Sequence, residues 1–131
     1  IMIENNVISK NNLIEFSSNP LLMCEAAECL KVINDTPDNI KLLVDVAHLK
    51  VSAKTLNFNP EEFLEKCNNI TGGYHLSDNN GLADTNEKFD DKSWFWNKIN
   101  KNSKYYSIEV YGLDFSEISS LNLLVKNKIA S

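Results

Sequence analysis

Four short apolar segments recur along the chain, and each one ends in a residue that can bind a metal ion. The segments are residues 1–4, 42–45, 73–75 and 105–109, which end in Glu4, Asp45, His75 and Glu109. Segments with helical patterns separate them, and this alternation favours right-handed βαβ units around a parallel sheet. Because the carboxyl ends of parallel strands meet at one edge of a sheet, we expect the four side chains to lie close together.

The remaining secondary structure follows from cap and loop signals. The pattern predicts strands over residues 1–4, 40–46, 70–76 and 105–110, and helices beginning near Asn19, Asn59, Ser93 and Asp114. Asn followed by Pro is typical of a helix N-terminus, and Asp114 with Glu117 resembles a capping box. Residues 5–12 form a polar stretch. Residues 77–91 are predicted to be a loop, and a loop of that length after a strand is usually functional, so we expect it to cover the site.

The spacing of the strand ends predicts a particular architecture. Asp45 follows Glu4 by 41 residues, His75 follows Asp45 by 30, and Glu109 follows His75 by 34. One βα unit of an eight-unit barrel takes roughly 30 residues. Residues 1–131 are therefore expected to form one α/β domain of the (β/α)8 TIM-barrel type, with about four units present. The sequence begins inside a predicted strand, so we expect a missing N-terminal half, or a second chain that completes the barrel.

Composition narrows the classes of function. Hydrophobic residues make up 43% of the 131, enough for a buried core, and the net charge of −5 argues against a nucleic-acid surface. We find no apolar run of about 18 residues and no signal peptide, so no membrane association is expected. The three cysteines include no Cys-x-x-Cys motif, which is typical of reduced thiols in a cytoplasmic protein.

The chemistry of the strand-end residues indicates a metal site. Three carboxylates and one imidazole suit Mn²⁺, Mg²⁺, Co²⁺ or Zn²⁺, although a single carboxylate at a strand end is commonly a helix cap or a surface group. Glu15 is the alternative to Glu4 as the first carboxylate. His48, three residues after Asp45, is expected to reach the same site. Asp78 is expected to orient His75 or to contact substrate.

These elements together resemble the xylose isomerase-like TIM-barrel superfamily. The matching motifs are Ile3-Glu4-Asn5, Asp45-Val46-Ala47-His48, His75-Leu76-Ser77-Asp78 and Ser107-Ile108-Glu109. The superfamily contains sugar isomerases, ketose 3-epimerases, inosose dehydratases, hydroxypyruvate isomerases and endonuclease IV. The resemblance covers essentially the whole chain and corresponds to the C-terminal half of the family barrel.

The resemblance implies a metal-dependent isomerase or epimerase acting on a small sugar or sugar phosphate. The metal would be held by Glu4, Asp45, His75 and Glu109. Glu4 and Glu109 would also be the catalytic proton-transfer groups, and His48 would touch the substrate. Alternatives are a sugar- or partner-binding barrel module without turnover, and an endonuclease IV-like phosphodiesterase. The endonuclease branch has an Asp-x-His motif where this chain has Asp84-Thr85-Asn86.

Overall fold

The computed structural model describes residues 1–131 and contains one four-stranded parallel sheet with helices packed against it. The strand order β1-β2-β3-β4 follows the sequence. The strands are β1 (Met2–Glu4), β2 (Lys41–Asp45), β3 (Thr71–Leu76) and β4 (Tyr105–Ile108). The helices are α1 (Lys10–Phe16), α2 (Ala26–Asn34), α3 (Val46–Leu56), α4 (Pro60–Cys67), η1 (Asn68–Ile70, a 3₁₀ turn) and α5 (Phe115–Ala130). The expected mixed α/β fold with a parallel sheet is confirmed.

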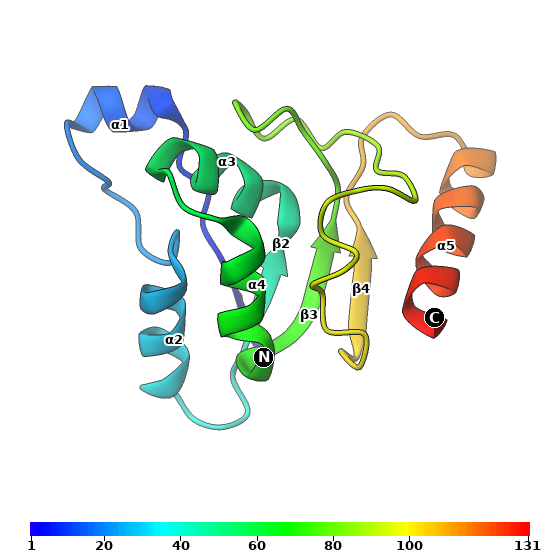
Figure 1. Ribbon diagram of the computed structural model, residues 1–131, viewed down its shortest axis with the longest axis horizontal. Coiled ribbons are helices and arrows are strands. Elements are labelled where there is room, and N and C mark those ends of the chain that lie inside the picture. The colour runs from blue at the N-terminus through cyan, green and yellow to red at the C-terminus, as the bar shows by residue number, and fades with distance from the viewer.

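The sheet has one covered face and one open face. Leu42 and Val44 of β2, with Tyr74 and Leu76 of β3, are buried under the helices, which Figure 1 shows in front of and beside the strands. Side chains alternate between the two faces along a strand, so the intervening residues lie on the opposite side. We call that side the open face. Its side chains include Met2, Lys41, Leu43, Tyr105 and Ser107, none of which is fully buried.

Two helices form where the cap signals predicted them. The Asn59 side chain accepts a hydrogen bond from the Glu61 amide at 2.9 Å, and Pro60 is the first residue of α4. Asp114 and Glu117 form a reciprocal capping box at the start of α5. At these two positions a side-chain cap followed by an apolar stripe correctly marks the start of a helix.

Two other helices were not expected from the sequence. Asp45 ends β2 and at the same time caps α3, so the chain passes from strand to helix without a loop. Six of the eleven residues of α3 are buried, so its sequence has no single apolar stripe. The short helix α1 begins inside the polar stretch 5–12, where Ser9 and Asn12 form a capping box.

One predicted helix begins later than expected, and another predicted helix does not form. The helix expected from Asn19 begins only at Ala26, because Asn19 caps a turn through the Leu21 amide and Met23 has a left-handed φ of 65°. Residues 93–99 form turns, although Phe95 and Trp96 are buried as core residues. Their aromatic rings pack against Phe89 from the preceding loop, and this packing is achieved without a regular helix.

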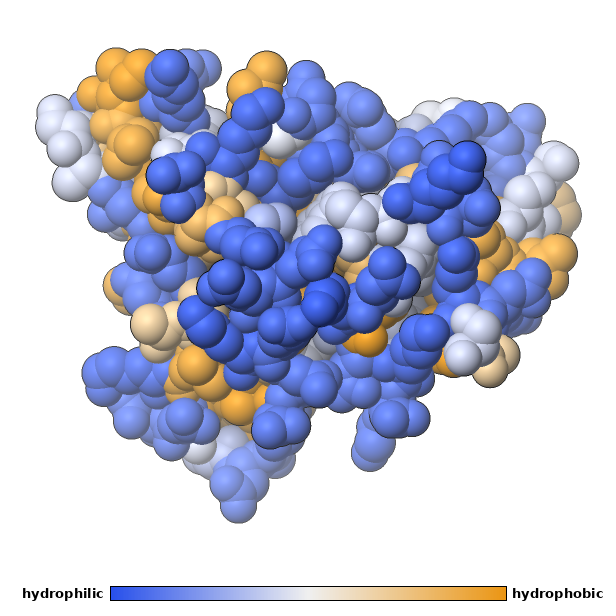
Figure 2. All heavy atoms as spheres, in the orientation of Figure 1, coloured by the Kyte–Doolittle hydropathy of each residue, from blue (hydrophilic) through white to orange (hydrophobic).

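Hydrophobic side chains reach the face seen in Figure 2 in several places, and one of these places lies over α1. Figure 2 shows a mostly hydrophilic surface with a hydrophobic area over α1 at the upper left. No residue of α1 is buried, and Ile14 and Phe16 are exposed. The helices are all too short or too polar to cross a lipid bilayer.

Candidate metal centre

The four strand-end residues converge at the carboxyl edge of the sheet. Asp45 and His75 are register partners in β2 and β3, so their side chains lie on the same face. Glu4 ends β1 and pairs with Leu43, two residues before Asp45, which places it on that face as well. Glu109 follows β4, and its amide donates to the Leu76 carbonyl at 3.0 Å, extending the ladder. All four side chains therefore lie on the open face.

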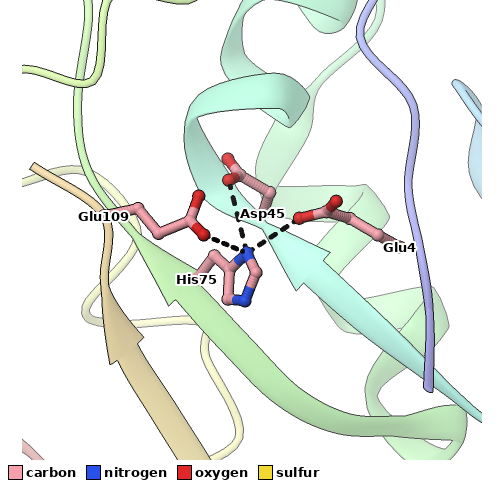
Figure 3. Close-up of side chains that lie close together, drawn as sticks. All are labelled: Glu4, Asp45, His75 and Glu109. Carbon is pink, nitrogen blue, oxygen red and sulfur yellow. Dashed lines mark ion pairs between the residues drawn. The ribbon is translucent and has the colours of Figure 1, made fainter. Parts of the chain in front are cut away.

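His75 is the centre of this cluster, as Figure 3 shows. Its Nδ1 atom lies 2.8 Å from Glu4 Oε1, 3.1 Å from Glu109 Oε1 and 3.9 Å from Asp45 Oδ2. One ligand atom from each residue lies within 4.8 Å of those of the other three. Divalent metals in proteins take ligand atoms at about 2.0–2.6 Å, so four atoms this close together would be able to share one ion.

Two atoms of the cluster are buried without a hydrogen-bond partner. His75 Nδ1 forms no hydrogen bond with proper geometry despite the three nearby carboxylates, and Asp45 Oδ2 has no donor at all. Buried polar atoms in native proteins nearly always have a hydrogen-bond partner. Two neighbouring buried atoms without one, His75 Nδ1 and Asp45 Oδ2, therefore need an explanation. A cation coordinated by both atoms would give each of them a partner. Three carboxylates and one imidazole are ligands that suit a divalent metal.

Asp45 has two functions that use different oxygens. Its Oδ1 atom accepts hydrogen bonds from the amides of Ala47 and His48 at 2.8 and 2.9 Å, which caps α3, while Oδ2 points to the cluster. The side chain is only 1% exposed. Burial raises the pKa of Asp45 to about 6, against the lowering effect of His48. The remaining ligands are accessible from the open face, with side chains 37% exposed for Glu4 and 36% for Glu109.

His48 lies beside the cluster with both ring nitrogens engaged. Nδ1 lies 3.0 Å from the Asn5 carbonyl, which only accepts, so this nitrogen carries a proton. Nε2 lies 3.1 Å from Asp84 Oδ2 and 4.0 Å from Asp45 Oδ2. Burial alone lowers the pKa of His48, but the two carboxylates and the carbonyl outweigh it and the pKa is raised. Its role in substrate binding stays a prediction.

The long loop after β3 reaches the edge of this cluster through Asp84. The first residues of the loop are held against α3, because Asp78 accepts a hydrogen bond from Lys50 at 2.6 Å and Asn79 donates to the Ala47 carbonyl at 3.0 Å. None of the ion pairs or hydrogen bonds of Asp78 involves His75, so the structure does not bring the expected orienting pair together.

The structure also distinguishes between Glu4 and Glu15 as the first carboxylate of the cluster. Glu4 belongs to the cluster, whereas Glu15 is exposed on α1 and is not part of it. The sequence assigned no contact in the site to Asn5, which stood only in the Ile3-Glu4-Asn5 motif and the polar stretch 5–12. It placed Asp84 in the loop expected to cover the site, but not against His48. The proximity of Asn5 to Glu4 in the sequence was the one available signal for Asn5.

No family model matches the chain, and neither the curated proteins nor the solved structures contain a match. The site therefore has to be interpreted from its own geometry.

Proposed function

We propose that this chain carries the metal site of a sugar or sugar-phosphate isomerase or epimerase of the xylose isomerase-like type. The observation that supports it most directly is the position of His75 Nδ1, buried, unpaired and facing the oxygens of Glu4, Asp45 and Glu109. Three carboxylates around one imidazole at the carboxyl ends of parallel strands are the ligand set that the resemblance implies.

The exposure of the ligands assigns them different roles. Asp45 is closed off from solvent and its second oxygen is occupied by α3, so it serves only as a ligand. Glu4 and Glu109 approach His75 from opposite sides in Figure 3 and are open enough to touch a substrate. One of them removes the proton beside the substrate carbonyl, and the other returns a proton to the neighbouring carbon or to the opposite face. A divalent metal held by Glu4, Asp45, His75 and Glu109 would supply Lewis acidity to polarise the substrate carbonyl.

The open face offers room for a small polar substrate next to His75. A hollow of about 360 Å³ is lined by residues that include Met2, Leu43, Tyr105 and Ser107. This volume falls in the range of small-molecule sites. A sugar in this hollow has its carbon chain over apolar side chains while its oxygens face the cluster.

The same open face supports a (β/α)8 barrel as the complete fold. β1 and β4 are edge strands whose outer sides have no partner in the sheet. Tyr105, on the open face, is 61% exposed. Proteins rarely leave strand edges unpaired, and Met2, Leu43 and Tyr105 also leave apolar surface partly exposed on this face. Four further parallel strands, from the same polypeptide or from a second chain, would close both edges and enclose the site.

Metal binding and proton transfer test this proposal separately. The chain is titrated with Co²⁺ after chelator treatment, and loss of the proton beside the carbonyl is then followed by ¹H NMR in D₂O for neutral ketoses and ketose phosphates. We expect Co²⁺ binding, with metal-dependent proton loss from at least one sugar. E4Q and E109Q should both lose proton transfer by at least about 100-fold. E15Q is the matched control and should behave like the parent chain.

Three results would contradict the proposal. Failure to bind any of Co²⁺, Mn²⁺, Mg²⁺ or Zn²⁺ would remove the metal site. Metal binding with no proton transfer from any sugar, both by this chain and by the assembly that supplies the further strands, would favour a binding module without turnover. Cleavage of abasic-site DNA would favour the phosphodiesterase.

A further inference from the structure

Asn5 is a buried polar residue directly after the first ligand. It is 2% exposed and lies where β1 has ended, opposite the last residues of β2. Its backbone amide donates to the Leu43 carbonyl at 3.2 Å, which continues the β1–β2 ladder for one more residue. A buried amide side chain at such a point must find both an acceptor and a donor.

Both halves of the Asn5 side-chain amide are paired with the backbone of Asp45. Oδ1 accepts from the Asp45 amide at 2.7 Å, and Nδ2 donates to the Asp45 carbonyl at 3.2 Å. The side chain thus replaces a strand residue and extends the ladder beyond β1. The Asn5 carbonyl also accepts from His48 Nδ1 at 3.0 Å. One residue therefore joins the ends of β1 and β2 and the first turn of α3.

These contacts determine where two ligands stand relative to each other. Glu4 is the residue before Asn5, and Asp45 is the residue whose backbone forms both hydrogen bonds with the Asn5 side chain. Holding the Asp45 backbone at both its amide and its carbonyl fixes the direction in which its side chain leaves the chain. We propose that Asn5 is a positioning residue of the metal centre, which sets the separation of Glu4 and Asp45 through this two-point contact. This inference rests on the metal binding of the proposed function, though not on the sugar chemistry.

The chain contains a matched control residue. Asn79 is 4% exposed, donates from Nδ2 to the Ala47 carbonyl at 3.0 Å, and accepts at Oδ1 from the Gly81 amide at 2.8 Å. It is as buried as Asn5, it makes two comparable side-chain hydrogen bonds, and it contacts the same helix. Its partners, however, are a helix carbonyl and a loop amide, and none of them is a ligand residue.

The experiment compares N5A with N79A. Co²⁺ affinity and the visible absorption spectrum of the Co²⁺ complex are measured for both variants, and urea unfolding is measured in chelator. We expect both variants to lose similar stability. N5A should bind Co²⁺ about 10- to 100-fold more weakly, with a changed spectrum, as is typical when a group that orients a ligand is removed. N79A should keep the parent affinity within about threefold.

Either of two results would overturn the inference: N5A with the parent affinity and spectrum, or equal losses of affinity in N5A and N79A. If N5A does not fold, the Co²⁺ affinity of N5D tests the inference instead. Its carboxylate keeps the acceptor for the Asp45 amide and loses the donor to the Asp45 carbonyl, while its added negative charge attracts cations. Weaker Co²⁺ binding by N5D would support positioning, and equal or tighter binding would refute it. If the parent chain binds no Co²⁺, the metal site itself has failed, which is a distinct outcome.

Discussion

Replacing Asp45 by Asn should stabilise the metal-free chain and weaken the metal-bound one. Asn is as good an N-cap as Asp, so the hydrogen bonds to the Ala47 and His48 amides are retained. What is lost is a buried negative charge. Burial raises the pKa of Asp45 from an ordinary 3.8 to about 6, and two pKa units correspond to roughly 3 kcal/mol.

The sign of this effect depends on pH. Because the pKa of Asp45 is higher in the folded chain than in the unfolded chain, the folded state is disfavoured as pH rises from about 4 to about 6, and the full penalty is present above that range. At pH 7.5, D45N removes about 3 kcal/mol of penalty and loses about 0.5–1 kcal/mol of charge attraction to the helix N-terminus. We expect a net gain of roughly 2 kcal/mol, which disappears at pH 4.

Urea unfolding in chelator and in saturating Co²⁺ measures both effects. At a free Co²⁺ concentration of 100 times the dissociation constant, the parent chain should gain about 2.7 kcal/mol, while D45N should gain much less, so their order of stability reverses. The reasoning is refuted if metal-free D45N is less stable than the parent chain at pH 7.5. It is equally refuted if D45N binds Co²⁺ with parent affinity.

Three further predictions concern the scaffold. G73A should lower the free energy of unfolding by about 1–3 kcal/mol in urea titrations, because the added methyl would lie 3.0 Å from the Tyr105 carbonyl oxygen of the neighbouring strand. An unchanged urea midpoint would show that β3 and β4 can move apart to admit the methyl without a loss of stability. Burial raises the pKa of Cys29 and of Cys67 to about 12, so iodoacetamide at pH 8 should modify them only after urea unfolding, and rapid labelling of the native chain would contradict their burial. D114A should cost about 1 kcal/mol by removing the α5 cap, whereas D114N should restore most of it; equal losses in both would exclude the cap as the cause.

The sequence was most informative at the strand ends. In a parallel sheet, a charged residue at the C-terminal end of a buried apolar strand lies at the carboxyl edge of the sheet. For this reason Asp45 and His75 could be placed together without a structure. Helices with a local cap, such as the one that Asp114 starts, were equally predictable.

The failures have physical causes as well. A ligand and a helix cap were treated as alternatives for Asp45, whereas its two oxygens serve both functions. The helix α3 itself was not predicted, because it is buried on most sides and lacks the usual apolar periodicity. The residues around Phe95 pack as a core, with isolated turn hydrogen bonds such as that from the Ile99 amide to the Phe95 carbonyl, and they form no regular helix. The contacts of Asn5 with Asp45 span 40 positions in the sequence, and no local pattern reveals them.

The division of one carboxyl group between α3 and the cluster has a thermodynamic consequence. Oδ1 of Asp45 holds the first turn of the helix, and Oδ2 faces His75, so a cation at the cluster and an intact helix terminus favour the same orientation of one side chain. Such coupling is reciprocal. With the proposed metal site, cation binding would tighten the first turn of α3. A change that frays this turn, even one far from the cluster, would then weaken the affinity for the cation by the same coupling free energy.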